Sequence, residues 1–149
     1  MLTVDLDSVE LMESTTAGGA IRVNFPLQSA LGTASTAAVL FELEPGNELA
    51  THTDSAEEAL LVLEGEGEAH VAGERALVRA GQLAIVPAMA PHGVRNVGTT
   101  TLRVLGFFSS STVVSTFEHP IGPDGETVTV AGAPAPIFAV IEEPSTLAV

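Results

Sequence analysis

The sequence contains no cysteine, lysine, tyrosine or tryptophan, and only four histidines among its 149 residues. Disulfide bonds, thiolate nucleophiles, Schiff-base lysines and phenolic general acids are therefore excluded. A catalytic site in this chain must be built from histidine, carboxylates, arginine, hydroxyl groups or a bound metal ion.

Basic residues are scarce as well: five arginines stand against nineteen acidic residues, which gives a formal net charge of -14. A surface with this charge repels the phosphates of nucleic acids and the headgroups of anionic lipids. We therefore expect neither a nucleic-acid partner nor a membrane-surface partner. The expected ligand is a small molecule that is neutral or cationic.

Long apolar runs are missing too. The longest are residues 59–63 and the proline-interrupted residues 83–91, which fall well short of the roughly 18 residues that a membrane span needs. Residues 1–13 are acidic, whereas a signal or transit peptide would be basic, so we predict a cytoplasmic protein.

Short apolar or alternating segments, separated by glycine and proline, make up most of the chain. Residues 37–44 place Val39, Phe41 and Leu43 on one face and two glutamates on the other, which is typical of a half-buried strand. Further strands are expected over residues 21–25 with Pro26 ending them, 49–54, 59–63, 68–71, 76–78, 83–86, 92–97 and 101–108. Many short strands without a helical period predict an all-β sandwich or barrel.

The two ends of the chain differ from this central part. Residues 1–20 show no sustained period and are interpreted as an N-terminal arm with at most one short strand, ahead of a β-barrel domain over residues 21–111. Residues 112–149 are too few for a second core, so we expect a C-terminal extension, with strands near 126–130 and 137–141, that packs on the barrel or on a partner subunit. Exposed sheet edges and the outward-facing Leu61 and Leu63 predict a homodimer.

Residues 46–96 hold most of the chemically active side chains, in two regularly spaced clusters. The first reads Gly46, five residues, His52, one residue, Asp54, three residues, Glu58, six residues, Gly65. The second reads Gly81, five residues, Pro87, then His92, three residues, Asn96. Residues two apart on a strand point to the same face about 6.6 Å apart, so His52 and Asp54 project together, while Glu58 and His92 reach the same region from other strands.

These clusters resemble the two motifs of the cupin superfamily, in which the first contains His-x-His followed by Glu and the second contains Pro-x-Gly followed by His and Asn. The resemblance implies a double-stranded β-helix, or jelly-roll barrel, with N- and C-terminal extensions. It also implies that His52, Glu58 and His92 bind a divalent metal ion. Two positions depart from the family: Asp54 stands where it has its second histidine, and Met89 where it has glycine.

The departure at Asp54 bears on the metal. A carboxylate can ligate directly or through water, so the predicted ligands are His52, Asp54, Glu58 and His92. Two histidines and two carboxylates favour Fe(II) or Mn(II) and disfavour copper, with Zn(II) or Ni(II) as alternatives. A polar cluster without metal is the competing interpretation.

Glu58 is the predicted catalytic base, with Asp54 as the alternative. Met89 is expected to change the loop and to place a thioether at the pocket mouth.

Fold alone does not determine function. The chain resembles quercetin-dioxygenase-like cupins, which implies a metal-dependent oxygenase acting on a small organic molecule. The alternatives are a non-catalytic binding module and a metal-dependent isomerase or lyase that does not use dioxygen. An apolar cavity wall suited to a partly hydrophobic or aromatic ligand is expected from Val39, Phe41, Leu43, Leu60, Val62 and Val94.

The remaining polar residues receive structural interpretations. Glu57 and Arg95 are expected to face solvent, His70 to lie on the surface, His119 to stand at a strand end and Asn96 to buttress the site. Arg22 and Arg103 either form surface ion pairs, which is the default, or enter the barrel to bind an anion.

Overall fold

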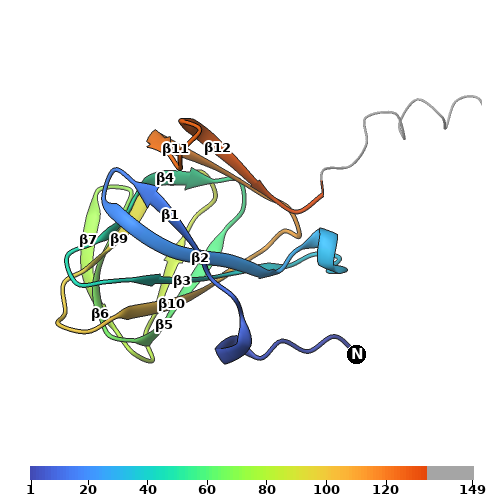
Figure 1. Ribbon diagram of the computed structural model, residues 1–149, viewed down its shortest axis with the longest axis horizontal. Helices are drawn as coiled ribbons and strands as arrows, with labels where there is room; N and C mark the ends of the chain where they lie inside the picture. The colour runs from blue at the N-terminus through green and yellow to red at the C-terminus, as the bar shows by residue number, and fades with distance from the viewer. Residues whose placement is uncertain (134–149) are drawn as a thin grey trace, which may run out of the picture.

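The structure is a computed structural model that describes residues 1–133. Two antiparallel six-stranded sheets form its body (Figure 1), with strand orders β1-β2-β3-β10-β5-β8 and β12-β11-β4-β9-β6-β7. The first sheet comprises β1 (Met12–Thr16), β2 (Gly19–Leu27), β3 (Ala37–Leu43), β10 (Leu102–Phe108), β5 (Glu58–Glu64) and β8 (Leu83–Val86). The second comprises β12 (Glu126–Ala131), β11 (Val113–Ile121), β4 (Glu48–Asp54), β9 (His92–Asn96), β6 (Glu66–Val71) and β7 (Glu74–Arg79).

Apart from two short 3-10 turns, η1 (Leu6–Ser8) and η2 (Ser29–Leu31), no helix occurs within residues 1–133. This confirms the predicted all-β jelly roll. No helix in this described part of the chain is long and apolar enough to cross a membrane.

The core lies between the two sheets and follows from the alternation along each strand. In β5 the side chains of Leu60 and Val62 are buried, whereas Leu61 between them is only partly covered. Each fully buried leucine or valine stabilises the fold by about 1.5–3 kcal/mol. The inward set includes Ile21, Phe41, Leu43, Leu60, Val62, Val94, Leu102, Val104 and Phe108.

Gly65 allows the chain to pass from the first sheet to the second. Its φ is +87°, and a Cβ at this position would lie 2.7 Å from the carbonyl oxygen of Thr101. Any side chain would therefore be strained twice, by the left-handed backbone angle and by the close approach. The glycine that closes the first motif is thus required by the turn between β5 and β6.

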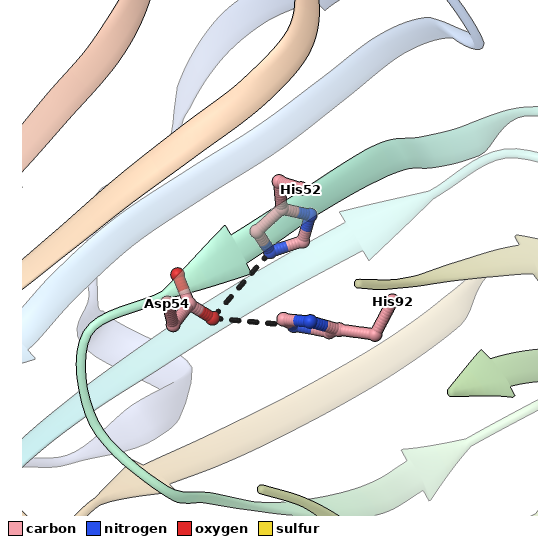
Figure 2. Close-up of side chains that lie close together, drawn as sticks. All are labelled: His52, Asp54 and His92. Carbon is pink, nitrogen blue, oxygen red and sulfur yellow. Dashed lines mark ion pairs between the residues drawn. The ribbon is translucent and has the colours of Figure 1, made fainter. Parts of the chain in front are cut away.

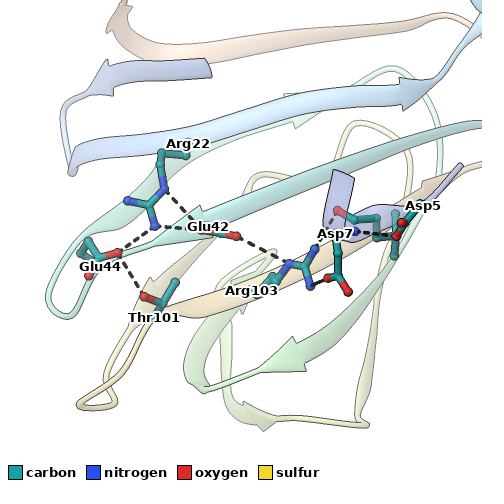
Figure 3. A network of polar contacts seen from close by, with 8 residues as sticks. Asp5, Asp7, Arg22, Glu42, Glu44, Thr101 and Arg103 are labelled. Atoms are coloured by element: carbon teal, nitrogen blue, oxygen red, sulfur yellow. Dashed lines mark hydrogen bonds and ion pairs between the residues drawn. The ribbon is translucent and has the colours of Figure 1, made fainter. Parts of the chain in front are cut away.

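The N-terminal segment covers part of the outer face of the first sheet. Leu6, Val9 and Leu11 pack there with Leu63 over Ala38, Leu40 and Leu105. Arg103 holds this segment, because its guanidinium donates to the carbonyl oxygen of Leu6 at 2.9 Å and to Asp7 at 3.0 Å (Figure 3).

Two elements extend beyond the sequence expectation. Pro26 was expected to end its strand, but β2 continues to Leu27; a register shift between Asn24 and Leu27 removes Pro26, which has no N–H, from the ladder. The segment after residue 112 enters the second sheet, where β11 pairs with β4 on one side and β12 on the other (Figure 1). The strand expected near residues 137–141 lies outside the described residues.

Candidate metal centre

Four polar side chains converge in the interior between the sheets. His52 and Asp54 come from the end of β4, Glu58 from the start of β5 and His92 from the start of β9. Each is no more than 5% exposed. His52 and His92 are paired across the β4–β9 ladder, and their ring centroids lie 4.1 Å apart. The structure thus brings together all four residues that the motif spacing singled out.

Both histidines are oriented by the backbone. Nδ1 of His52 lies 2.8 Å from the carbonyl oxygen of Ala50, and Nδ1 of His92 lies 2.9 Å from that of Ala90. A carbonyl oxygen only accepts hydrogen bonds, so each Nδ1 carries the hydrogen and each Nε2 is left with a lone pair when the ring is neutral. Orientation of this kind is typical of histidines that bind a metal.

The spacing of the opposing atoms fits a metal ion. Oδ2 of Asp54 lies 3.5 Å from Nε2 of His52 and 3.2 Å from Nε2 of His92 (Figure 2), and Oε2 of Glu58 lies 3.4 Å from the same His92 atom. Ligands bound at about 2.0–2.2 Å in a tetrahedral shell are roughly 3.3–3.6 Å apart. Nε2 of His92 is buried without a hydrogen-bond partner, which is costly unless an ion or a proton occupies the site. The residues therefore fit a divalent metal.

Asp54 is held by a residue that the motifs do not contain. The hydroxyl of Ser115, on β11, donates to Oδ1 of Asp54, which leaves Oδ2 directed at the histidines. The same strand places the ring of Phe117 on that of His52, with centroids 4.7 Å apart and planes 15° from parallel. The alternation of Val113, Ser115 and Phe117 was the only sequence signal that β11 turns these side chains inward.

Glu58 occupies space that a glycine leaves free. Gly106 lies on β10 beside β5, and a Cβ on it would overlap with Oε1 of Glu58 and lie 2.9 Å from Cγ1 of Val39. Gly106 has no need of an unusual φ. Its lack of a side chain is what lets the glutamate reach the site, a role that sequence reasoning missed because the two residues are far apart in the chain.

The protein environment shifts the pKa values of the two carboxyl groups, Asp54 and Glu58, in opposite directions. Burial alone would raise the pKa of Asp54, but the adjacent imidazoles of His52 and His92 and the hydrogen bond from Ser115 hold it well below its usual range. For Glu58 burial dominates and raises the pKa, which only His92 and His52 oppose. Burial lowers the pKa of His92, but Asp54 and Glu58 outweigh it and raise the pKa to about 10. In the absence of metal, a proton on His92 thus satisfies the cluster.

A cavity of about 480 Å³ adjoins this cluster, with His52, Asp54 and Glu58 in its wall. It is bounded mainly by β1, β2, β3, β11 and β12. Val39 and Phe41 line it as expected, together with Phe25, Phe108 and Phe117. The other predicted wall residues, Leu43, Leu60, Val62 and Val94, pack in the closed core instead.

Met89 does not lie at the mouth of this cavity. It adopts a φ of +64°, the backbone conformation for which the cupin motif has glycine, and its side chain is 60% exposed. Its N–H donates to the carbonyl oxygen of Asp54 at 2.8 Å. The loop therefore keeps its left-handed residue despite the substitution, and Met12 is the methionine that lines the cavity.

The other polar residues lie away from the cluster. Asn96 is buried at the far end of β9, where its amide donates to the carbonyl oxygens of Leu43 and Thr100. His70 pairs with Thr51, and Arg22 and Arg103 form ion pairs outside the barrel. Glu57, Arg95 and His119 are exposed.

A family model described as a cupin domain matches residues 39–108. No curated protein matches the chain significantly. The fold is similar to that of a protein described as a predicted oxalate decarboxylase from Thermotoga maritima, with 22% identity over 73% of this chain and 99% of that chain and a TM-score of 0.65. It is also similar to a putative sugar phosphate isomerase from Acidithiobacillus ferrooxidans (23% identity, 88% and 90% covered, TM-score 0.62) and to a polyketide cyclase from Streptomyces resistomycificus (21% identity, 72% and 78% covered, TM-score 0.61).

At these identities the structural neighbours establish the fold alone. The matched domain, the two spaced motifs and the convergence of their histidines and carboxylates inside the barrel show that residues 39–108 form a cupin domain.

Proposed function

We propose that this cupin is a metal-dependent oxygenase that acts on a small organic molecule. The observation that carries the proposal is the convergence of Nε2 of His52, Nε2 of His92 and a carboxylate oxygen of Asp54 within 4.8 Å of one another, with the His92 atom buried and unpaired. A cavity of about 480 Å³ beside these atoms is within the size range of small-molecule sites.

In this proposal His52, Asp54 and His92 hold the ion, and Glu58 lies directly beside it. A mixed set of imidazole and carboxylate ligands suits Fe(II) or Mn(II). Such an ion would supply Lewis-acid and redox chemistry at the inner end of the cavity.

Glu58 is the proposed general base. Its carboxylate lines the cavity, and burial raises its pKa, which makes it a better proton acceptor than an ordinary glutamate. Asp54 is less suited, because its pKa is held low and Ser115 occupies one of its oxygens. We therefore assign proton transfer to Glu58 and ligation to Asp54.

The raised pKa of Glu58 also supports a second candidate, a metal-dependent isomerase or lyase. A base beside a Lewis acid can move a proton on an oxygenated substrate without consuming dioxygen. The same fold carries such varied chemistry, as the names of its structural neighbours indicate, among them an oxalate oxidase in complex with glycolate and a putative sugar phosphate isomerase.

The test begins with the metal content of untagged protein, measured by inductively coupled plasma mass spectrometry. We expect near-stoichiometric iron or manganese in the wild type, loss of the metal in His92→Ala, and retention in the matched control His70→Ala, whose imidazole pairs with Thr51 away from the site. Oxygen uptake with aromatic and diketone substrates then separates the two enzyme classes, and Glu58→Gln should retain metal but lose turnover.

Each outcome favours a different function. Turnover without oxygen uptake would replace the oxygenase with the isomerase or lyase. Metal that persists in His92→Ala, or a wild type that takes up no metal, would contradict the metal site and favour a non-catalytic binding module.

A further inference from the structure

No arginine of this chain lines the cavity. The sequence has no lysine and five arginines, all within the described residues. Four of them pair with carboxylates: Arg22 with Glu42 and Glu44, Arg75 with Glu68, Arg79 with Glu66, and Arg103 with Asp7. Arg95 is exposed on β9, and the cavity wall contains no arginine.

The wall contains two carboxylates instead. Asp54 and Glu58 both border the cavity and are almost completely buried, where charges are weakly screened. A divalent ion held by these residues would have its two positive charges balanced by two negative ones. The resembled three-histidine, one-glutamate set leaves one positive charge uncompensated, so the aspartate at position 54 removes the charge that would attract an anion.

The rest of the wall is largely apolar and partly aromatic. Phe25 and Phe108 stack with centroids 6.1 Å apart, and Phe117 lies on His52. The side chains of Asn24 and Gln28, which also line the cavity, already accept hydrogen bonds from the backbone N–H groups of Phe25 and Ala30. A ligand body in this space meets mainly ring faces and aliphatic groups, and the polar side chains that remain, such as Ser14 and Thr129, are uncharged.

We infer that the cavity selects neutral, largely apolar ligands and rejects carboxylate and phosphate anions. The inference rests on the metal site proposed above and adds the substrate class to it. An oxygen atom of the ligand faces the cluster of His52, Asp54 and His92, and its apolar body lies among the phenylalanines. An anion entering the same space would lose its hydration next to two carboxylates and find no guanidinium or ammonium group.

The test compares two probes of nearly the same shape: ortho-hydroxyacetophenone, which is neutral at neutral pH, and salicylate, which is an anion. Oxalate serves as a small dianion. Binding is measured by isothermal titration calorimetry on protein loaded with Zn(II), which is redox-inert, and on metal-free protein. We expect the neutral probe to bind at least about tenfold more tightly than salicylate in both forms, and oxalate not to bind. In the loaded protein the anions meet no net positive charge, and in the metal-free protein they meet the carboxylates of Asp54 and Glu58 with no arginine in the cavity wall.

A pair of variants sharpens the comparison. Thr129 lines the cavity and is register partner of Ser115, whereas Thr116 lies next to Ser115 on β11 and points to the other face. Both are exposed, so an arginine is tolerated at either, and both changes alter the net charge equally. Thr129→Arg should improve salicylate binding by about tenfold, the effect of one nearby opposite charge, and Thr116→Arg should leave it unchanged.

Four results would each overturn the inference. Salicylate could bind as tightly as the neutral probe, oxalate could bind saturably, the neutral probe could fail to bind, or the two arginine variants could have equal effects. Failure of the proposed function is distinguishable, because it appears as absent metal or absent turnover, whereas this test measures ligand preference with and without metal.

Discussion

Two clusters of acidic and basic side chains lie on opposite sides of β3 and its neighbours, and they differ in nearly every physical respect. On the outside, Arg22 lies 2.8 Å from both Glu42 and Glu44, and Arg103 links Glu42 to Asp7 (Figure 3). On the inside, the two histidines and two carboxylates of the candidate metal centre are buried with no arginine among them. The outer cluster is half in solvent, with Arg22 37% exposed.

The comparison shows which charges are structural. The outer carboxylates pair with arginines, which are permanently charged. Water screens these ion pairs, so they add little stability and need no further ligand. Inner carboxylates have only histidines, whose charge depends on a proton or is replaced by an ion. A buried acidic cluster that lacks a permanent counter-charge is therefore the better functional candidate.

The largest effect is expected from pH. A group whose pKa is raised by folding stabilises the protein fully below its ordinary pKa and loses that contribution as the pH rises through the folded value. For His92 these values are 6.5 and about 10. We expect metal-free protein to lose on the order of 5 kcal/mol of unfolding free energy across this window, measured by urea unfolding at a series of pH values.

This chain is well suited to that experiment, because it has no cysteine, lysine or tyrosine to titrate in the same range. Metal-loaded protein is the control, since an ion replaces the proton on His92 and should abolish the dependence. The structure would be contradicted if metal-free protein kept its full stability to pH 10.

Gly106→Ala should have the next largest effect. The added methyl group would overlap with Oε1 of Glu58, and overpacking of this kind costs about 1–3 kcal/mol. Chemical denaturation of the single variants and of Gly106→Ala combined with Glu58→Ala measures the coupling. The cost should fall clearly in the double variant, and additive effects would show that the glycine does not make room for the glutamate.

Ser115→Ala removes the hydrogen bond that holds Asp54. Loss of a buried bond to a charged group costs about 1.5 kcal/mol, and loss of a group that orients a ligand weakens metal binding by about tenfold. Competition with a chelator measures the affinity. Thr116→Ala, which alters the opposite face of β11, should change neither quantity; if it matches Ser115→Ala, the effect belongs to the strand and not to the hydroxyl.

Arg22→Ala should have the smallest effect. Half-exposed ion pairs contribute about 0.5 kcal/mol, so urea unfolding should reveal a slight loss and metal content should not change. A change in metal content would show that the outer cluster is coupled to the inner one across β3.

Much of the barrel could be predicted from the sequence, because strand periodicity and turn chemistry are local. The strands from residue 37 to 108 were expected close to their observed bounds. The convergence of His52, Asp54, Glu58 and His92 was also expected, since spacing along a strand decides which face a side chain occupies. That the two motifs meet at one site was predicted from their resemblance to the cupin motifs, because periodicity alone does not indicate which strands lie together.

The sequence by itself therefore determined the strands, the candidate ligands and the shortage of positive charge. Only the tertiary structure decided how those ligands are held. Ser115, Phe117 and Gly106 act on residues 48 to 65 positions away in the chain, through contacts between β11 and β4 and between β10 and β5. Which strand lies beside which, and in what register, is set by packing of the whole core, and no local pattern encodes it.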